Sequence, residues 1–204
     1  AQSKESKCAS WYYTSKGGFY WAGAYVADDF LLVGTDDGGN GYTSQTSRLL
    51  LLDPATGELL DSWDGLNADI RSTVVYDAGT DAYYFTSKGG TFYSVQVTGD
   101  RKLTNKWSVN LANGVGGVPM STSTPVVYGG RAYLGVSGAG QFTPYSGHNI
   151  TVVDLSTFSI AYSVPTMGYP QTSGLLTTAY QNEDGYNYVY FFDNFTPGKL
   201  RVIR

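Results

Sequence analysis

The sequence predicts an all-β protein, a β-propeller segment built from four-stranded antiparallel blades. Its 204 residues include 26 Gly and 18 Tyr but only 15% charged residues, a composition typical of strands joined by many tight turns. Apolar runs alternate with turn residues in one clear unit, at 123–128, 131–136, 149–154 and 159–164. The pattern recurs on both sides, because Tyr76, Tyr128 and Tyr180 follow one another at a spacing of 52 residues.

Short strands with frequent turns are also typical of a β-sandwich. A fixed period favours the propeller, because each four-stranded sheet buries its faces only against neighbouring blades. The period is slightly longer than the ~40 to 50 residues of common propeller repeats, and the additional residues lie in loops.

In chain order, residues 1–8 are polar and are expected to form a leader. The run 9–14 is strand-like but has no preceding blade, so we expect an outermost strand of another blade. Residues 9–204 then form one partial propeller domain. Its three full blades and partial fourth blade are predicted at 20–66, 70–112, 121–166 and 172–204.

The remaining strands follow from the same alternation of apolar runs and turns. They are expected at 22–26, 30–35, 48–52 and 59–63, then 71–76, 82–86, 91–97 and 103–109, and finally 174–180, 188–192 and 199–203. The chain begins without Met and ends inside a predicted strand, so we expect a segment of a longer protein. An open arc, a closed four-blade ring and half of a dimeric ring are the alternatives.

Charge and hydropathy exclude two classes of partner. The net charge of −4 leaves no basic stripe that could neutralise phosphates, so nucleic acid is not expected. Apolar runs such as 49–52 are far shorter than the ~20 residues of a transmembrane helix, and no transmembrane segment is predicted. Cys8 is the only cysteine and cannot form a disulfide within the chain.

The first blade carries a more specific pattern. An apolar strand ends at Asp53, a turn follows with Thr56 and Gly57, and the next strand contains Trp63. This resembles the repeat of the pyrroloquinoline-quinone-like (quinoprotein-type) propellers. The resemblance implies that Asp, Thr and Gly shape the turn and that Trp packs between blades.

The other blades match this repeat less completely. The second keeps Trp107, and the third keeps Asp154 and Thr157 with Tyr162 at the aromatic position. Two departures are visible: Asp61 occupies the usual Trp place in the first blade, and Phe158 replaces Gly in the third. The structural repeat residues are therefore expected to be those that match the pattern: Asp53, Thr56, Gly57, Trp63, Trp107, Asp154, Thr157 and Tyr162.

A second resemblance concerns location. Residues 14–25 together with 34–38 are similar to the propeller region of large secreted or surface-attached proteins of Gram-positive anaerobes, and the chain would match its C-terminal half. This resemblance implies an extracellular or cell-surface setting.

No catalytic site is predicted. Quinoprotein dehydrogenases of this superfamily use a calcium-bound quinone with a carboxylate base and often a vicinal cysteine pair, and none of these ligand motifs can be transferred to this sequence. Quinone is therefore not supported, and a degenerate dehydrogenase is only the third hypothesis.

Two loops could bind a ligand. Asp36, Asp37 and Asn40 lie in a Gly-rich loop whose oxygens could bind Ca²⁺, although the same residues are ordinary turn formers. The consecutive aromatics Phe19, Tyr20 and Trp21 precede an innermost strand and are predicted at one mouth of the axial channel.

The leading functional hypothesis is a non-catalytic extracellular scaffold or recognition module whose partner is a protein or glycan at the cell surface. The alternative is carbohydrate or small-ligand binding at the channel mouth, with Ca²⁺ assistance. Open blade edges would also permit self-association.

Overall fold

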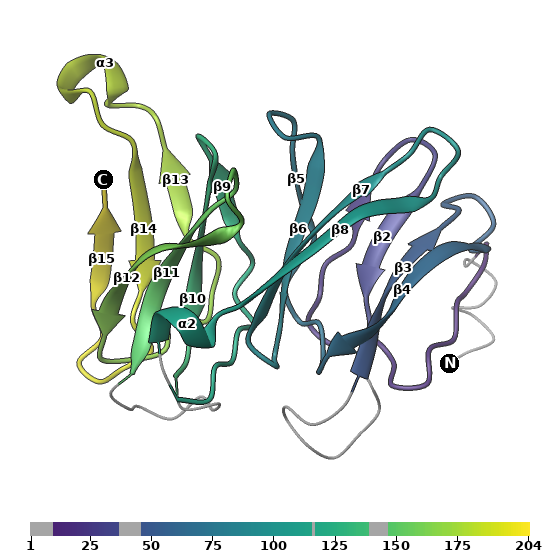
Figure 1. Ribbon diagram of the computed structural model, residues 1–204, viewed down its shortest axis with the longest axis horizontal. Helices are drawn as coiled ribbons and strands as arrows, with labels where there is room; N and C mark the ends of the chain where they lie inside the picture. The colour runs from purple at the N-terminus through teal and green to yellow at the C-terminus, as the bar shows by residue number, and fades with distance from the viewer. Residues whose placement is uncertain (1–9, 37–45, 116, 139–146) are drawn as a thin grey trace.

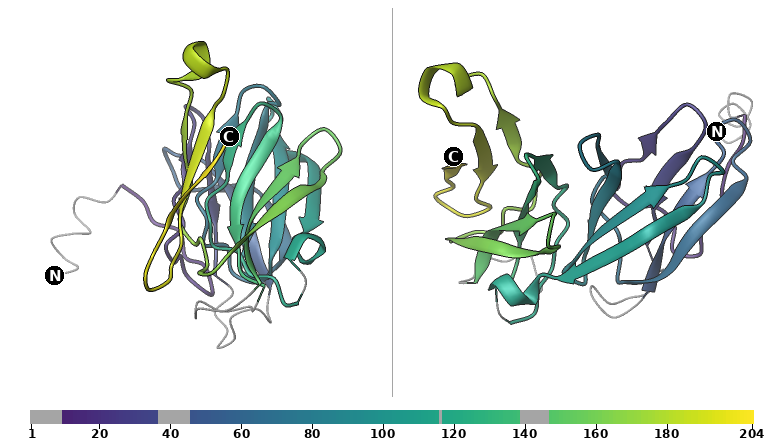
Figure 2. Two further views of the ribbon diagram at one scale, coloured as in Figure 1. Left: turned by 90° about the vertical axis from the view of Figure 1, so that its left-hand side faces the viewer. Right: turned by 45° about the horizontal axis from the view of Figure 1, so that its top comes forward.

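The computed structural model of the chain describes residues 10–36, 46–115, 117–138 and 147–204. These residues form four antiparallel sheets that follow one another along an arc, with the first and last sheets at opposite ends (Figures 1 and 2). In every sheet the strands pair in sequence order, and the last sheet has three strands where the others have four. This is the predicted partial β-propeller.

The strands have the following bounds. The first sheet contains β1 (Tyr25–Val26), β2 (Leu31–Gly34), β3 (Thr46–Leu52) and β4 (Leu59–Asn67). The second contains β5 (Val75–Asp77), β6 (Ala82–Ser87), β7 (Thr91–Val97) and β8 (Leu103–Asn110). The third contains β9 (Val126–Tyr128), β10 (Arg131–Val136), β11 (His148–Asp154) and β12 (Ser159–Thr166), and the fourth β13 (Leu175–Thr177), β14 (Tyr188–Phe192) and β15 (Leu200–Ile203).

Two short helices, α2 (Ala112–Val115) and α3 (Gln181–Asp184), lie in connections between strands. Within the described part of the chain, neither is long or apolar enough to cross a membrane.

The hydrophobic core consists of one cluster at each boundary between neighbouring sheets. Strand β6 shows why, because its side chains alternate between two boundaries: Phe85 packs in the cluster with the first sheet and Tyr84 in the cluster with the third. Both faces of β6 are therefore covered, and all of its residues are buried. Burial on both faces explains the continuous apolar and aromatic runs in the sequence.

The first strand of each sheet is shorter than predicted. Strand β5 begins at Val75 rather than 71, because the residues before it bond to neighbouring blades instead of to a ladder. The Thr73 amide donates to Thr124 Oγ1 at 2.9 Å, and the Gly23 amide donates to Thr73 Oγ1 at 3.2 Å. These bonds link the segments that precede the first strands of three successive blades. Tyr180, predicted to close a first strand, lies beyond the end of β13 and caps α3.

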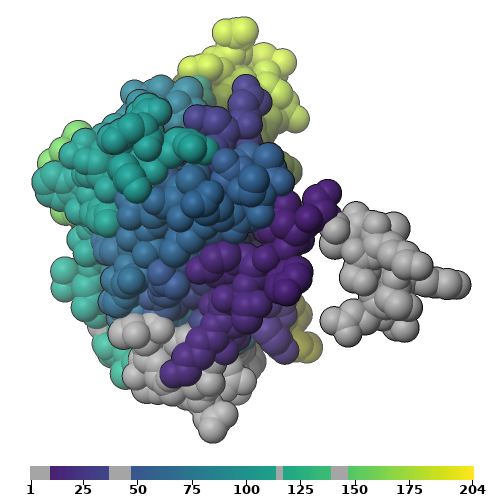
Figure 3. Space-filling view, turned by 90° about the vertical axis from the view of Figure 1, so that its right-hand side faces the viewer, coloured from purple at the N-terminus to yellow at the C-terminus, as the bar shows by residue number. Residues whose placement is uncertain are grey.

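The run 9–14 was predicted as an outer strand, and its described part, residues 10–14, forms no ladder among the described residues. The segment packs over the first sheet, as Figure 3 shows, where the indole of Trp11 donates to the Pro54 carbonyl at 2.9 Å. Leu50 and Leu52, which alternate with the core residues Leu49 and Leu51, are also buried. The outer face of the first sheet is therefore covered.

Candidate functional site

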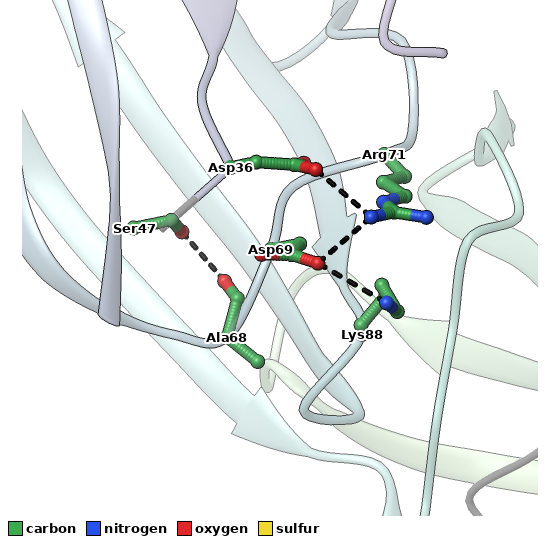
Figure 4. A network of polar contacts seen from close by, with 6 residues as sticks. All are labelled: Asp36, Ser47, Ala68, Asp69, Arg71 and Lys88. Carbon is green, nitrogen blue, oxygen red and sulfur yellow. Dashed lines mark hydrogen bonds and ion pairs between the residues drawn. The ribbon is translucent and has the colours of Figure 1, made fainter. Parts of the chain in front are cut away.

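Four charged side chains gather at one end of the first two sheets, and we call them the Arg71 cluster: Asp36, Asp69, Arg71 and Lys88 (Figure 4). Asp36 lies two residues beyond β2, and Lys88 directly follows β6. Asp69 and Arg71 belong to the connection from β4 to β5. The cluster therefore joins the ends of two blades.

Backbone hydrogen bonds fix the connection between these strand ends. The Ile70 amide donates to the Thr35 carbonyl at 3.1 Å, and the Lys88 amide donates to the Asp69 carbonyl at 2.8 Å. Ser47 Oγ also donates to the Ala68 carbonyl at 2.6 Å. The backbone that carries Asp69 and Arg71 is therefore held in place on both sides.

The charges of the cluster alternate in sign. Arg71 Nη2 lies 2.8 Å from Asp36 Oδ2 and 3.1 Å from Asp69 Oδ2, and Lys88 Nζ lies 3.1 Å from Asp69 Oδ2. Two carboxylates and two cations give a formal sum of zero. Such a chain of pairs reduces the cost of burying each charge.

Burial shifts the pKa values of Asp36 and Lys88, the two outer members of this chain of charge pairs. Lys88 is 1% exposed and Asp36 is 7% exposed. Burial raises the pKa of the Asp36 carboxyl, although the hydrogen bond from Arg71 acts in the opposite direction. Burial also lowers the pKa of the Lys88 amine, which the hydrogen bond to Asp69 opposes.

Two aromatic rings lie against the guanidinium of Arg71. Its Cζ atom is 4.6 Å from the ring centroid of Tyr20 and 5.0 Å from that of Trp21, both within the range of cation–π attraction. The two rings are tilted by 48° with centroids 5.7 Å apart. Arg71 thus links the aromatic loop to the buried charges.

The aromatic loop, Phe19–Trp21, remains open to solvent. Its three side chains are 41%, 54% and 64% exposed in chain order. Trp21 has a φ of 63°, a left-handed conformation that is unusual for a bulky residue. Strained backbone of this kind persists only where surrounding contacts hold it, and it concentrates at functional sites.

The structure brings several predicted site residues together. Tyr20 and Trp21 come from one predicted loop and Asp36 from the other, and all three converge on Arg71. Sequence reasoning missed Asp69, Arg71 and Lys88. The repeat held one signal, because Asp36 and Lys88 are 52 residues apart and follow the second strands of successive blades.

The predicted calcium loop is only partly described. Asp37 and Asn40 lie outside the described residues, and Asp36 Oδ2 faces Arg71. Within the described ranges, no group of three or more His, Cys, Asp or Glu side chains is arranged to hold a metal ion. Cys8 also lies outside the described residues.

The repeat residues shape the turns between third and fourth strands. Asp53 Oδ1 accepts from the amides of Ala55 and Thr56 at 2.9 and 3.0 Å, and Asp154 Oδ1 accepts from those of Ser156 and Thr157 at 2.9 and 3.2 Å. Both turns then reach a left-handed residue, with a φ of 73° at Gly57 and 49° at Phe158.

The aromatic repeat residues face neighbouring blades to different extents. Trp63 packs edge-on against Tyr93 of the second sheet at 5.3 Å, whereas Trp107 is 61% exposed. Tyr162 lies beside Arg131, 5.9 Å from its Cζ atom to the ring centroid. Asp61, at the usual Trp place, contacts the next blade differently: its Oδ2 accepts from the Leu103 amide at 2.8 Å.

Comparison with solved structures identifies the fold. BamB from Moraxella catarrhalis matches with a TM-score of 0.54 and 14% identity over 95% of this chain. The quinohemoprotein alcohol dehydrogenase ADHIIG from Pseudomonas putida HK5 matches with a TM-score of 0.60 and 14% identity over 90% of it. The chain has a pyrroloquinoline-quinone-like β-propeller repeat fold.

A third match is the β-propeller domain of Cps50 (Swd1) from Myceliophteria thermophila, with a TM-score of 0.55 and 11% identity over 85% of this chain. The chain spans 52% of the BamB chain, 30% of the dehydrogenase and 47% of the Swd1 domain. No protein-family model matches the chain, and no curated protein sequence matches it significantly.

Proposed function

We propose that this chain is a non-catalytic propeller module that recognises a protein partner through the aromatic loop Phe19–Trp21. The observation that carries the proposal is that the aromatic side chains of this loop are exposed to solvent and yet held in place. Its side chains are 41–64% exposed, yet Tyr20 and Trp21 contact a guanidinium that two carboxylates hold in place. Rigid exposed aromatics lose little conformational entropy on binding and are enriched among the residues that dominate interface energies.

The charge pairs within the Arg71 cluster favour a structural role for the cluster over a catalytic one. Arg71 and Lys88 both face carboxylates, so the cations are used within the protein. Asp69 Oδ2 receives both of them. We infer that the cluster positions the aromatic loop and that the module acts outside the cell or at its surface, as the resemblance to surface-protein propellers implies.

A photocrosslinking amino acid at position 20 tests the recognition of a protein. We expect one discrete protein adduct on cells of the source organism, and competition by the unlabelled wild-type chain but not by Trp21→Ala. Tyr12, which is 87% exposed and outside the loop, is the matched control position. Equal labelling from positions 12 and 20, or none from position 20, would contradict the proposal.

The proposal that the module is non-catalytic is tested by a separate measurement. The chain is incubated with pyrroloquinoline quinone, Ca²⁺, a redox dye and a panel of primary alcohols. We expect no dye reduction above that of the free quinone. Reproducible alcohol-dependent reduction that Asp36→Asn abolishes would instead support the dehydrogenase hypothesis.

One observation favours a second candidate, a small polar ligand or sugar bound at the mouth with Ca²⁺. Asp36 Oδ1 and Arg71 Nε are buried and have no hydrogen-bond partner among the described residues. Buried polar atoms are normally paired, so a bound ligand could supply these two contacts. A rise in melting temperature with Ca²⁺ or simple sugars that Asp36→Asn removes would support this candidate.

Self-association is a further proposal, and it rests on the last sheet. One face of β13–β15 exposes large apolar side chains: Leu175 at 67%, Phe192 at 60%, Leu200 at 58% and Val202 at 49%. Strand pairing places Phe192 opposite Leu200 on this face. Either a further blade of a longer protein or a second copy of the chain would bury it.

A further inference from the structure

A groove of about 490 Å³ lies between the second and third sheets, lined by none of the residues of the Arg71 cluster. One wall is the face of the second sheet that carries Gln96 and Trp107, and the other is the turn 155–158 between β11 and β12. The two sheets diverge at this place, toward the top of Figure 1. The volume is within the ~300 to 1,000 Å³ typical of small-molecule sites.

The groove exists because polar side chains replace apolar ones at this boundary. In β3, Leu49 and Leu51 face the next sheet and are fully buried. In β7, Ser94 and Gln96 line the groove instead. Polar residues at a position that normally seals two blades break the packing pattern, and such departures are expected at functional sites.

An exposed aromatic pair forms the apolar part of the groove. Trp107 is 61% exposed, and its ring centroid lies 6.3 Å from that of Phe158. Phe158 in turn stacks on Phe92 at 5.5 Å, which fixes it against the core. The indole of Trp107 therefore offers an open face beside a ring that is held in place.

The polar groups of the groove are neutral and oriented. Gln96 Nε2 donates to the Thr80 carbonyl at 3.2 Å, and Asn105 Nδ2 donates to Gln96 Oε1. Tyr84 donates its hydroxyl hydrogen to Thr80 Oγ1 at 2.9 Å. Asn105 has a φ of 46°, so strained backbone lies at this wall too. The eleven lining residues include no Asp, Glu, Lys, Arg or His.

We propose that this groove binds a neutral oligosaccharide. A sugar ring presents an apolar C–H face that fits an exposed indole, and its hydroxyls match amide and hydroxyl side chains. A phosphate, nucleotide or charged peptide would lose hydration in a groove that offers no opposite charge. The site is independent of the aromatic loop proposed above for a protein partner.

Isothermal titration with cellohexaose, maltohexaose and chitohexaose tests the proposal. We expect saturable binding of at least one of them to the wild-type chain and at least tenfold weaker binding to Trp107→Ala. Tyr12→Ala, which removes an exposed aromatic ring that lies outside both sites, is the matched control and should bind as the wild type does. Sugar binding that is lost in Trp21→Ala but kept in Trp107→Ala would place the sugar at the channel mouth instead and would overturn the proposal.

Asn105→Gly is the second variant, because it removes a groove amide while easing the left-handed backbone, and it should also weaken binding. It keeps the proposal testable if Trp107→Ala does not fold. Binding of none of the three sugars would overturn the proposal, as would equal binding by Trp107→Ala or Asn105→Gly. An uncharged polyproline peptide that binds where the sugars do not would replace it with a peptide site.

Discussion

Arg71 Nη2 lies 2.8 Å from Asp36 Oδ2 and 3.1 Å from Asp69 Oδ2, so one nitrogen joins the end of β2 to the connection that enters β5. The side chain of Arg71 is 13% exposed, and those of the two carboxylates are 8% and 6% exposed. This contact ties the first two blades together and also supports the rings of Tyr20 and Trp21.

Removal of this guanidinium should therefore be costly. Arg71→Ala leaves two buried carboxylates without their shared cation, and we expect a loss of about 3–5 kcal/mol in the free energy of unfolding. The control is Arg48→Ala, because Arg48 and Asp64 form a 2.6 Å pair whose side chains are 37% and 64% exposed. That pair should contribute under about 1 kcal/mol. Urea denaturation measures both, and equal losses would contradict the structural role of the cluster.

The protonation of Asp36 gives a second prediction. Burial raises its pKa above the usual 3.8, so in the window between 3.8 and the raised value the folded state binds more protons than the unfolded state. Its contribution to stability therefore falls as pH rises through this window. Asp53 has the opposite sign, because backbone hydrogen bonds from Ala55 and Thr56 lower its pKa.

Carboxyl ¹³C NMR titration checks the two directions separately. We expect the midpoint of Asp36 above 3.8 and that of Asp53 below it. Urea denaturation of the wild type should show stability falling as pH rises above 3.8, and Asp36→Asn should remove this fall while Asp53→Asn should not. A midpoint for Asp36 below 3.8 would refute the assignment of a desolvated carboxyl.

The contact between Trp11 and Gly57 gives a third prediction. A Cβ atom at Gly57 would lie 2.3 Å from Cε3 of the Trp11 indole, and its φ of 73° disfavours side chains. Gly65 has nearly the same φ, 74°, but open space around its Cβ position. Gly65→Ala should therefore cost about 1–2 kcal/mol from the backbone alone, and Gly57→Ala about 1–3 kcal/mol more from overpacking.

Thermal or urea unfolding measures this difference, and the double variant isolates its cause. In the background Trp11→Ala, the extra loss at Gly57 should disappear because the ring is gone. If the extra loss persists there, the segment 10–15 does not pack over this turn in solution.

The exposed face of the last sheet gives a fourth prediction. If this face mediates self-association, light scattering should show a mass that rises with concentration, and Phe192→Asp should suppress the rise. Val118→Asp is the control, because Val118 is similarly exposed, at 57%, but lies in a connection between blades. A monomeric mass for the wild type at every concentration excludes association through this face.

Local chemistry was predictable from the sequence. Asp53 and Asp154 accept hydrogen bonds from amides two and three residues onward, so the turn is decided by a few adjacent residues. The strands of the blades were predictable for the same reason, because alternating apolar residues and turn formers act over short spans. The segment 10–15 was not, because it has a strand-like sequence but pairs with no strand among the described residues.

The candidate site was predictable only in part. The aromatic loop and Asp36 stood out by composition, but their meeting point at Arg71 depends on contacts across 35 and about 50 residues. Charged residues such as Asp69 and Lys88 are usually solvated, and nothing local marks them as buried. Their burial follows from the way three segments meet at the ends of two blades.

The sequence by itself determined the repeat, the turns and the propeller class, because each follows from residues close together in the chain. Only the tertiary structure decided the different environments of residues that hold similar positions in the repeat. Trp63 and Trp107 both lie in fourth strands, yet one packs against Tyr93 and the other opens onto a groove. The difference arises from the neighbouring strands, where Leu49 and Leu51 seal one boundary, while Ser94 and Gln96 leave the next one open.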